Sequence, residues 1–186
     1  MSLRKAAFLD RDGVINVDRG YVWLWDDFEF LPGVVEAMRA LEAAGYALIV
    51  ITNQSGIARG YYSEASFLAL TDRIERELAA HGVHLSGTYY CPHLPAASME
   101  PHAIKCDCRK PMPGMIQQAA REIGIDLSQS IIVGDKESDV AAGVAAGIPS
   151  RYLVCPEKSE LPEAATDACL SLSDCVAKLG VTTVGD

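Results

Sequence analysis

Short apolar runs alternate along this chain with segments of helical periodicity, and this alternation limits the folds that the chain can adopt. Five apolar runs have the length of buried strands; they cover residues 6–9, 46–51, 88–90, 130–133 and 150–154. Four segments space their apolar residues as an amphipathic helix does; they cover residues 33–44, 63–81, 113–123 and 138–146. Strands and helices that alternate in this way predict a doubly wound α/β fold, with a mainly parallel sheet and helices on both faces.

A single domain is expected from the length of the chain. Its 186 residues suit one ordinary domain, and 49% of them are hydrophobic, which supplies a substantial core. The segments between the predicted strands are short and leave no room for a large cap domain. An inserted irregular loop, at about residues 91–112, is therefore expected to shape any pocket within this one domain of residues 1–186.

The periodic signal weakens after Cys155. Residues 150–154 are the last strand that the sequence predicts, and residues 156–165 have the composition of a loop. Ser173 is a candidate N-cap for a short final helix that ends at Leu179. The sheet is thus expected to end with the strand at 150–154.

The charge and hydropathy of the chain restrict its partners. A formal net charge of −9 argues against nucleic acid, but a small anionic substrate stays compatible with it, because a metal ion and local cations can reverse the potential inside one pocket. An apolar stretch follows Arg4 and Lys5, but Asp10 ends it too early for a signal peptide, and no run reaches membrane-spanning length. We expect a cytoplasmic protein that binds neither nucleic acid nor a membrane, and a monomer because no exposed apolar stripe is evident.

Polar residues cluster directly after three of the predicted strands. The clusters contain Asp10 and Asp12 after the first strand, Thr52 after the second, and Asp135 with Asp139 after the fourth. Open parallel sheets collect their ligand-binding groups at the carboxyl edge of the strands, so these clusters are expected to meet in space. Alternate residues of a strand point to one side, which lets the carboxylates of Asp10 and Asp12 converge on one target.

Two converging carboxylates can hold a divalent cation and divide the roles of nucleophile and acid or base. An Asp-x-Asp pair in isolation is more often an ordinary solvated turn. The later clusters favour a reaction site instead, together with Arg109 and Lys110, which supply adjacent cations just before a predicted helix. The combination indicates a site for an anion.

The four polar motifs resemble those of the haloacid dehalogenase superfamily of phosphotransfer enzymes. They read Asp10-Arg11-Asp12-Gly13, Thr52, Lys110 and Gly134-Asp135 with Asp139, and the resemblance extends over about residues 5–153. Within this superfamily the chain looks most like the D-glycero-D-manno-heptose 1,7-bisphosphate 7-phosphatase family. The shared features are residues 10–16, residues 52–60, a Cys/His loop and residues 108–111. The resemblance implies a Rossmann-like α/β fold and a Mg²⁺-dependent phosphomonoesterase.

The resemblance also implies a mechanism. Asp10 is the implied nucleophile, which forms an aspartyl-phosphate, and Asp12 is the implied general acid and base. Thr52, the amide of Asn53 and Lys110 are implied to hold the transferring oxygens. The implied reaction removes the C7 phosphate of heptose 1,7-bisphosphate and gives heptose 1-phosphate for ADP- or GDP-heptose and lipopolysaccharide core biosynthesis.

A magnesium site is implied at the same edge of the sheet. Its ligands are Asp10, Asp135 and the backbone carbonyl of Asp12. Asp139 is implied to orient Lys110 or a metal-bound water instead of binding the cation directly.

Substrate selection is implied for a set of residues around these motifs. They are Asp18, Arg19, Gly20, Tyr21, Asn53, Gln54, Ser55, Arg109 and Lys136. Arg109 is the best candidate for recognising a second phosphate, because a guanidinium can bind an anion through two parallel hydrogen bonds. The alternative for Arg109 is a surface cation paired with an acid, which its position next to Lys110 makes less favoured.

The loop after the third predicted strand carries a candidate zinc site. Six cysteines in a chain of this size are too few for a disulfide scaffold, which favours reduced thiols or metal ligands. The four candidate ligands, which the family resemblance supports, are Cys91, His93, Cys106 and Cys108. His102 could replace His93, but the Cys-x-His pairing favours His93. With four protein ligands the Zn²⁺ is expected to be structural and to set how Arg109 and Lys110 enter the pocket.

Two alternatives stay open. Histidinol-phosphate phosphatase shares the catalytic motifs and the zinc loop, although its loop between the ligand pairs is usually shorter than this one. Receiver domains of signalling pathways also place aspartates, a threonine and a lysine at the carboxyl edge of a parallel sheet and bind Mg²⁺ there. Such domains store an aspartyl-phosphate without a general acid and base, so Asp12 beside Asp10 favours an enzyme.

Overall fold

The structure, a computed structural model that describes residues 3–96, 101–155 and 161–181, is built on a six-stranded parallel sheet. The strands are β1 (Ala6–Leu9), β2 (Ala47–Asn53), β3 (Leu85–Cys91), β4 (Ile131–Gly134), β5 (Ser150–Val154) and β6 (Asp167–Cys169). They lie in the order β3-β2-β1-β4-β5-β6, and every pair of neighbours is parallel. The strand order reverses between β1 and β4, which is where open α/β sheets bind ligands.

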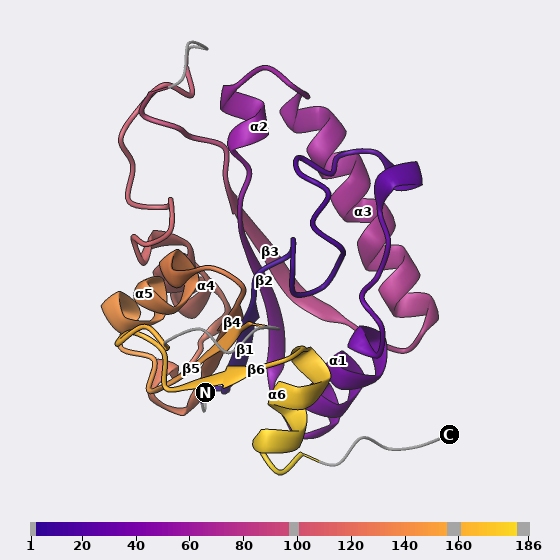
Figure 1. Cartoon of the computed structure of the whole chain (residues 1–186), viewed down its shortest axis with the longest axis vertical. Coiled ribbons are helices and arrows are strands. Elements are labelled where there is room, and N and C mark those ends of the chain that lie inside the picture. The colour runs from indigo at the N-terminus through magenta and orange to yellow at the C-terminus, as the bar shows by residue number, and fades with distance from the viewer. Residues whose placement is uncertain (1–2, 97–100, 156–160, 182–186) are drawn as a thin grey trace.

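Helices cover both faces of the sheet (Figure 1). The α-helices are α1 (Val34–Ala43), α2 (Ser55–Ala58), α3 (Glu64–Ala80), α4 (Gly114–Ile123), α5 (Glu137–Ala146) and α6 (Leu172–Lys178), and 3₁₀ turns lie at Trp25–Asp27 and Leu127–Gln129. Helices α1, α3 and α6 pack on one face, and α4 and α5 pack on the other. The predicted doubly wound α/β fold is therefore confirmed.

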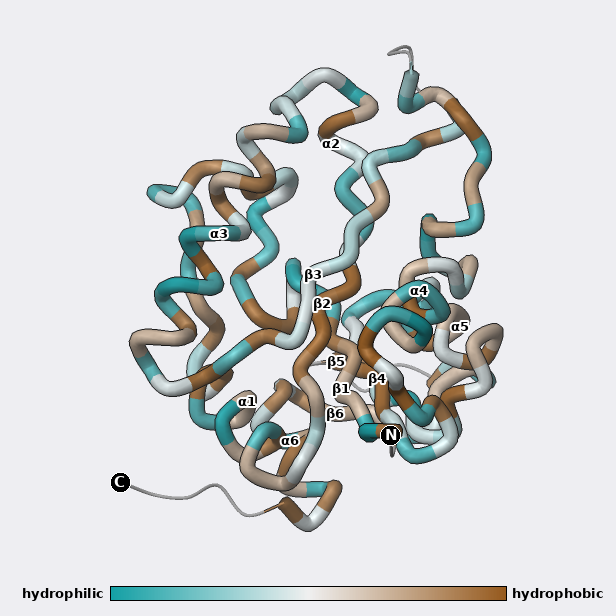
Figure 2. The backbone as a smooth tube through the Cα atoms, turned by 180° about the vertical axis from the view of Figure 1, so that it is seen from behind, coloured by the Kyte–Doolittle hydropathy of each residue, from teal (hydrophilic) through white to brown (hydrophobic). Residues whose placement is uncertain are grey.

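The side chains of the central strands alternate between two hydrophobic cores. In β1, Ala7 and Leu9 point to the core under α1, α3 and α6, whereas Ala6 and Phe8 point to the core under α4 and α5. All four side chains are fully buried. Figure 2 shows the central strands among the most hydrophobic parts of the chain. Burial on both faces explains why these strands are continuous apolar runs in the sequence.

The register of the three central strands brings their carboxyl ends to one level. Leu9, the last residue of β1, is aligned with Val50 of β2 and with Val133 of β4. The alignment continues past the strand, because the backbone N–H of Asp10 donates to the carbonyl oxygen of Val133 over 3.0 Å. Residues that follow these strands in the sequence are thus held at the same edge of the sheet.

The sheet has one strand more than the sequence predicts. Residues 150–154 form β5 as expected, but they are not the last strand, because β6 pairs with β5 and aligns Asp167 with Tyr152. β6 has three residues, and its sequence Asp-Ala-Cys lacks an apolar run. Helix α2 is also missing from the prediction, since four residues are too short to show helical periodicity. Part of the predicted loop at 156–165 lies outside the described residues.

The final helix begins earlier than the sequence predicts. Ser171 is the N-cap of α6, and its hydroxyl accepts a hydrogen bond from the backbone N–H of Asp174 over 3.2 Å. Ser173 lies inside the first turn and donates to the carbonyl oxygen of Gly33 over 3.0 Å. The assignment of the cap to Ser173 was wrong because both serines fit the composition rule and the backbone conformation alone distinguishes them.

Replacing this cap is expected to lower the stability of the protein. Ser171→Ala removes the acceptor for an otherwise unpaired helix N–H, so we expect the free energy of unfolding to fall by about 1 kcal/mol, as measured by urea denaturation. Ser173→Ala is the matched control, which removes a solvent-exposed hydrogen bond and should cost less. Equal losses for the two variants would contradict the assignment of the cap to Ser171.

No separate cap domain interrupts the described residues. The long loop after β1 and the loop after β3 both lie at the carboxyl edge of the sheet (Figure 1). The connection from β3 to α4 is irregular in its described part, as expected for residues 91–112. Among the helices in the described segments, none combines the length and apolar character of a membrane span.

Candidate active site

A cavity of about 400 Å³ lies at the carboxyl edge of the sheet. Its walls come from the loops after β1, β2 and β4 and from the segment before α4. The lining residues are Asp12, Asp18, Gly20, Tyr21, Asn53, Gln54, Ser55, Tyr62, Arg109, Lys110, Lys136 and Ser138. The expected meeting of the polar clusters in space is therefore confirmed.

A buried ammonium group joins two of these clusters. Lys110 Nζ lies 2.7 Å from Asp10 Oδ1 and 2.8 Å from Asp139 Oδ1, and it donates to the carbonyl oxygen of Ile51 over 2.8 Å. Lys110, Asp10 and Asp139 are each at most 5% exposed. The expected contact of Asp139 with Lys110 is confirmed.

Burial and the contact between Asp10 and Lys110 shift the pKa values of these two residues in opposite directions. Burial raises the pKa of Asp10 to about 7, although the neighbouring Lys110 partly offsets this effect. Burial disfavours the charged form of Lys110, but the carboxylates of Asp10 and Asp139 outweigh it and raise the pKa of Lys110. Two carboxylates thus share one ammonium ion, which leaves Asp10 incompletely compensated. A divalent cation beside Asp10 would favour its ionised, nucleophilic form.

The backbone of Lys110 is fixed from β2. The side-chain amide of Asn53 donates to the carbonyl oxygen of Lys110 and accepts from its N–H, both over 3.1 Å. Asn53 is the last residue of β2, so this pair of bonds ties the segment before α4 to the sheet. The sheet therefore determines where Lys110 enters the site.

Asp135 completes a set of three carboxylates. Ligand oxygens of Asp10, Asp135 and Asp139 lie within 4.8 Å of one another. Asp135 Oδ1 is buried without a hydrogen-bond partner, and burial raises the pKa of this carboxyl group. Gly13 permits its position, because a Cβ atom there would lie 2.5 Å from Asp135 Oδ2. Lys110 engages Asp139 Oδ1 and the backbone N–H of Lys136 donates to Asp139 Oδ2 over 2.9 Å, whereas Lys110 engages Asp10 through Oδ1. The unpartnered oxygen of Asp135 and the carboxylate of Asp10 are therefore the groups that fit a bound Mg²⁺.

Asp12 lines the cavity beside the end of β2. Gln54 Nε2 lies 3.3 Å from Asp12 Oδ2 and donates to Thr52 Oγ1 over 2.8 Å. Tyr62 orients this amide from the other side, since its hydroxyl donates to Gln54 Oε1 over 2.5 Å. Reasoning from the sequence misses Tyr62. Residues 52–60 resemble the phosphatase family, and the position of Tyr62 two residues after this segment is a signal that could have identified it.

All but one of the predicted substrate-binding residues line the cavity. The exception is Arg19, whose guanidinium pairs with Glu29 on the exposed surface. Tyr21 has a backbone φ of 55°, and its ring packs edge to face on Tyr61 with 4.7 Å between the centroids. Such a conformation is uncommon outside glycine and is found preferentially at binding sites.

Arg109 and Lys136 add two positive charges to the described lining of the cavity. Arg109 NH1 donates to the carbonyl oxygen of His93 over 3.2 Å. Lys136 Nζ lies 3.5 Å from Asp18 Oδ2 and 3.5 Å from Asp135 Oδ2. Together with Lys110 these side chains suit a substrate with more than one anionic group.

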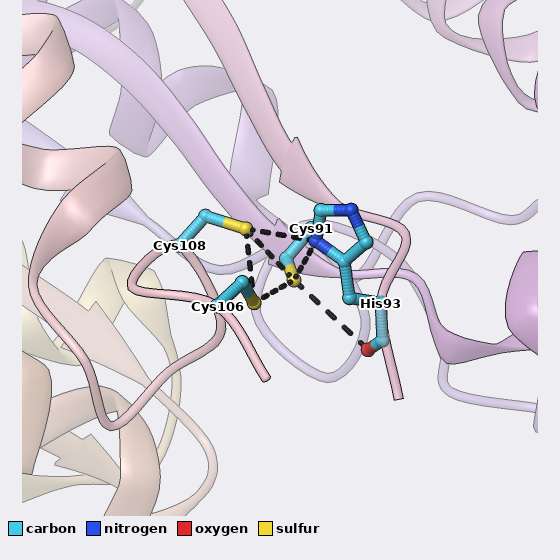
Figure 3. Close-up of side chains that lie close together, drawn as sticks. All are labelled: Cys91, His93, Cys106 and Cys108. Atoms are coloured by element: carbon cyan, nitrogen blue, oxygen red, sulfur yellow. Dashed lines mark hydrogen bonds between the residues drawn. The ribbon is translucent and has the colours of Figure 1, made fainter. Parts of the chain in front are cut away.

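The four predicted zinc ligands converge in the loop after β3 (Figure 3). Cys108 Sγ lies 3.1 Å from Cys91 Sγ and 3.3 Å from both Cys106 Sγ and His93 Nδ1. Ligands placed about 2.3 Å from a tetrahedral zinc ion are about 3.7 Å apart, so the cluster is close to the size that zinc requires. The ring of His102 lies 6.0 Å from that of His93, and His102 is not part of the cluster.

Burial and hydrogen bonding shift the pKa values of the three thiols. Burial raises the pKa of Cys91, and it raises that of Cys108 to about 11. For Cys106, burial is outweighed by hydrogen bonds from the neighbouring thiols, and the pKa is lowered. Zn²⁺ binds thiolates, so binding of the metal would release the protons of these thiols. Three thiolates and one imidazole are a donor set that zinc prefers.

A comparison against known families agrees with the fold. Residues 4–147 match the family model described as haloacid dehalogenase-like hydrolase. The chain belongs to this family of hydrolases. Among curated relatives it is similar to the D-glycero-beta-D-manno-heptose-1,7-bisphosphate 7-phosphatase of Photorhabdus laumondii, with 50% identity over 172 residues, 91% of this chain and 92% of the relative. The protein of the same name from Escherichia coli K12 is 52% identical over 159 residues, 86% of this chain and 83% of the relative.

Solved structures of similar proteins support the same resemblance. The D,D-heptose 1,7-bisphosphate phosphatase from B. bronchiseptica, in complex with magnesium and phosphate, has a TM-score of 0.80 and 34% identity, with coverage of 94% of this chain and 97% of that one. The enzyme of that name from Burkholderia thailandensis has a TM-score of 0.67 and 30% identity, with coverage of 96% and 100%. The family resemblance inferred from the motifs is confirmed.

Proposed function

We propose that this chain is a Mg²⁺-dependent phosphatase that removes the C7 phosphate of D-glycero-D-manno-heptose 1,7-bisphosphate. The observation that carries the proposal is the ammonium group of Lys110, buried between Asp10 and Asp139 at a cavity that further cations line. Relatives about half identical to this chain are named for this reaction. The product is heptose 1-phosphate, for ADP- or GDP-heptose and lipopolysaccharide core biosynthesis.

The first half of the reaction transfers the phosphoryl group to Asp10. The carboxylate attacks phosphorus and forms an aspartyl-phosphate, while the bond from phosphorus to the C7 oxygen breaks. Asp12 gives a proton to that departing oxygen, so that it leaves as an alcohol. Thr52, Lys110 and the backbone amide of Asn53 bind the phosphoryl oxygens and stabilise their charge in the transition state.

The second half hydrolyses the aspartyl-phosphate. Asp12, now ionised, removes a proton from a water molecule that attacks phosphorus, and Asp10 is restored. Mg²⁺ bound by Asp10, Asp135 and the backbone carbonyl of Asp12 would offset the repulsion between carboxylate and phosphate. Asp139 holds Lys110 in place in both halves.

Arg109 binds the phosphate that is not cleaved. Arg109→Lys keeps the charge but loses one of two parallel hydrogen bonds, so we expect the KM for the bisphosphate to rise about tenfold with little change in kcat. Steady-state phosphate release measures both constants. Arg121→Lys, on the exposed surface of α4, is the matched control and should behave like the wild type. A fall in kcat at unchanged KM would argue against this role for Arg109.

The other lining residues bind the sugar and help to bind its second phosphate. They are Asp18, Gly20, Tyr21, Asn53, Gln54, Ser55 and Lys136. Arg19 reaches the substrate if its ion pair with Glu29 opens. That pair is exposed on both sides, and opening an exposed ion pair costs little because water solvates the separated charges.

Cys91, His93, Cys106 and Cys108 bind a structural zinc ion. Four protein ligands leave no position for a reactive water, so the metal orders the loop and takes no part in the chemistry. The loop at about 91–112 is an insertion in a single domain of residues 1–186. The enzyme acts as a monomer in the cytoplasm, where reducing conditions keep these thiols available to the metal.

The experiment that tests this function compares phosphate release, with Mg²⁺ present, from both anomers of the heptose bisphosphate and from histidinol phosphate. A large preference for one heptose anomer supports the proposal and identifies that anomer. Preference for histidinol phosphate keeps the mechanism and replaces the substrate. Absence of turnover with all three would refute the enzymatic assignment and favour a domain that stores an aspartyl-phosphate.

A further inference from the structure

Three side chains converge on the carboxylate of Asp12. Arg11 NH2 donates to Oδ1 over 2.9 Å and to Oδ2 over 3.0 Å, and Asn16 Nδ2 donates to Oδ1 over 3.0 Å. Gln54 Nε2 lies 3.3 Å from Oδ2. Arg11 and Asn16 are 3% and 0% exposed, and neither lines the cavity. Their route to a bound substrate is therefore through Asp12.

Each oxygen of Asp12 accepts two hydrogen bonds, and those to Oδ1 are on average shorter than those to Oδ2. Arg11 NH2 also donates to the carbonyl oxygen of Val22 over 2.6 Å, so its remaining hydrogen is divided between Oδ1 and Oδ2. Oδ1 accepts a full hydrogen bond from Asn16 in addition. Within the described residues, Oδ2 has the longer contact with Gln54, whose Nε2 makes its shorter bond to Thr52. Oδ2 thus accepts the weaker hydrogen bonds and is the oxygen that more readily carries a proton.

Some polar atoms of the residues around Asp12 have no hydrogen-bond partner among the described residues. In the described structure, Asn16 Oδ1, Arg11 Nε and Arg11 NH1 are buried without a partner. A buried polar atom without a hydrogen bond destabilises the folded state, and departures of this kind are expected at functional sites. Asn16 cannot reverse its amide to relieve this cost, because Nδ2 already donates to Asp12 and, over 2.9 Å, to the carbonyl oxygen of Val17.

We propose that Asn16, supported by Arg11, is a positioning residue that keeps Asp12 Oδ1 as an acceptor and leaves Oδ2 as the oxygen that transfers the proton. This inference rests on the proposed role of Asp12 as the acid. In the first half of the reaction the O–H bond at Oδ2 breaks and the proton passes to the leaving oxygen, while Oδ1 keeps its bonds. Without Asn16 the carboxyl group can rotate and either oxygen can carry the proton, so fewer bound complexes are ready to react.

The test varies the leaving group. Asn16→Leu keeps the branched shape and the number of heavy atoms of the side chain and removes the donor. The ratio kcat/KM reports the steps up to departure of the leaving group, so it separates the acid role of Asp12 from its later role as base. A sugar alkoxide needs a proton to leave, whereas p-nitrophenolate does not. We expect kcat/KM to fall about 30-fold for the heptose bisphosphate and less than about threefold for p-nitrophenyl phosphate.

A second comparison asks whether Asn16 acts through Asp12. In an Asp12→Asn background, adding Asn16→Leu is expected to change kcat/KM for the bisphosphate less than about twofold, because the acid is already absent. The same fall as in the wild-type background would overturn the proposal. Equal losses for the two leaving groups, or no loss for either, would overturn it as well.

Folding and substrate identity are controlled separately. Circular dichroism establishes that Asn16→Leu is folded, and Asn16→Ala, which also lacks the donor, replaces it in the same measurements if it is not. A wild-type protein that hydrolyses p-nitrophenyl phosphate but not the heptose bisphosphate would refute the proposed substrate. In that case histidinol phosphate, which is also an alkyl ester, replaces the heptose bisphosphate. The fall in kcat/KM caused by Asn16→Leu is then compared between histidinol phosphate and p-nitrophenyl phosphate, so the inference about Asn16 is still tested.

Discussion

Asp10→Asn is expected to abolish phosphate release from the heptose bisphosphate, with kcat lower by about 10⁴-fold or more. Asparagine has nearly the shape of aspartate and can still accept the hydrogen bond from Lys110, but its amide oxygen is a poor nucleophile. Steady-state phosphate release in the presence of Mg²⁺ measures the effect. Asp72→Asn, which replaces an exposed aspartate of α3, is the matched control and should keep wild-type activity. Substantial residual turnover in Asp10→Asn would mean that another group is the nucleophile.

Asp10→Asn is expected to lose its phosphatase activity without becoming less stable. Burial raises the pKa of Asp10 from 3.8 to about 7, so the folded protein binds this proton more tightly than the unfolded chain does. The wild type therefore loses stability as the pH rises from 3.8 through about 7, and the variant does not share this loss. At pH 8 without added Mg²⁺ we expect the variant to unfold at a temperature no lower than that of the wild type. A markedly lower temperature would mean that inactivity reflects unfolding.

Removal of the proposed zinc ion from the Cys/His cluster is expected to weaken substrate binding more than the chemical step. Arg109 follows Cys108 directly and donates to the carbonyl oxygen of His93, so it depends on the ordered loop. Lys110 is held separately by Asn53 and by Asp10. After treatment with a strong chelator and return of Mg²⁺, we expect the KM for the bisphosphate to rise about tenfold or more, with a smaller fall in kcat.

Two variants separate this effect from loss of Mg²⁺. Cys106→Ser removes a zinc ligand without any chelator and should reproduce the rise in KM. Cys155→Ser, which lies outside the cluster, is the matched control and should keep both the metal and the wild-type constants. Mass spectrometry of the native protein gives the zinc content of each sample. Complete loss of zinc at an unchanged KM would show that the cluster does not support the substrate pocket.

The central strands could be predicted from the sequence because each is buried on both faces. β1 coincides with the apolar run predicted at residues 6–9, and α4 begins within one residue of the helix predicted at 113–123. Burial on both faces makes β1 a continuous apolar run, and burial of one face gives α4 its helical spacing of apolar residues. β6 differs, since its three residues are a strand because β5 offers them a pairing edge. Such pairing between distant segments leaves little local signal.

Some residues of the site can be identified from the sequence by their type and motif, whereas others reach the site only because of the path of the backbone. Asp10 and Lys110 could be identified because their residue types, and the order of the motifs that contain them, resemble the pattern of the haloacid dehalogenase superfamily. Asn16 lies four residues from Asp12 in an irregular turn, where the N–H of Gly13 donates to the carbonyl oxygen of Asn16 over 2.8 Å. That turn brings the Asn16 amide to Asp12, and residue spacing does not reveal it. The same holds for Arg19, because its orientation depends on where the loop places Glu29.

The proposed nucleophile and Arg109, which is proposed to bind the second phosphate, are attached to different parts of the sheet. Asp10, Thr52 and Asp135 belong to or follow β1, β2 and β4, and each of these strands has a neighbour on both sides. Arg109 belongs to the loop that follows β3, the strand at one end of the described sheet. A substitution in that loop can alter which phosphate ester is accepted while the nucleophile stays in place. A lineage of such proteins can therefore acquire new substrates gradually, with a working phosphatase at every step.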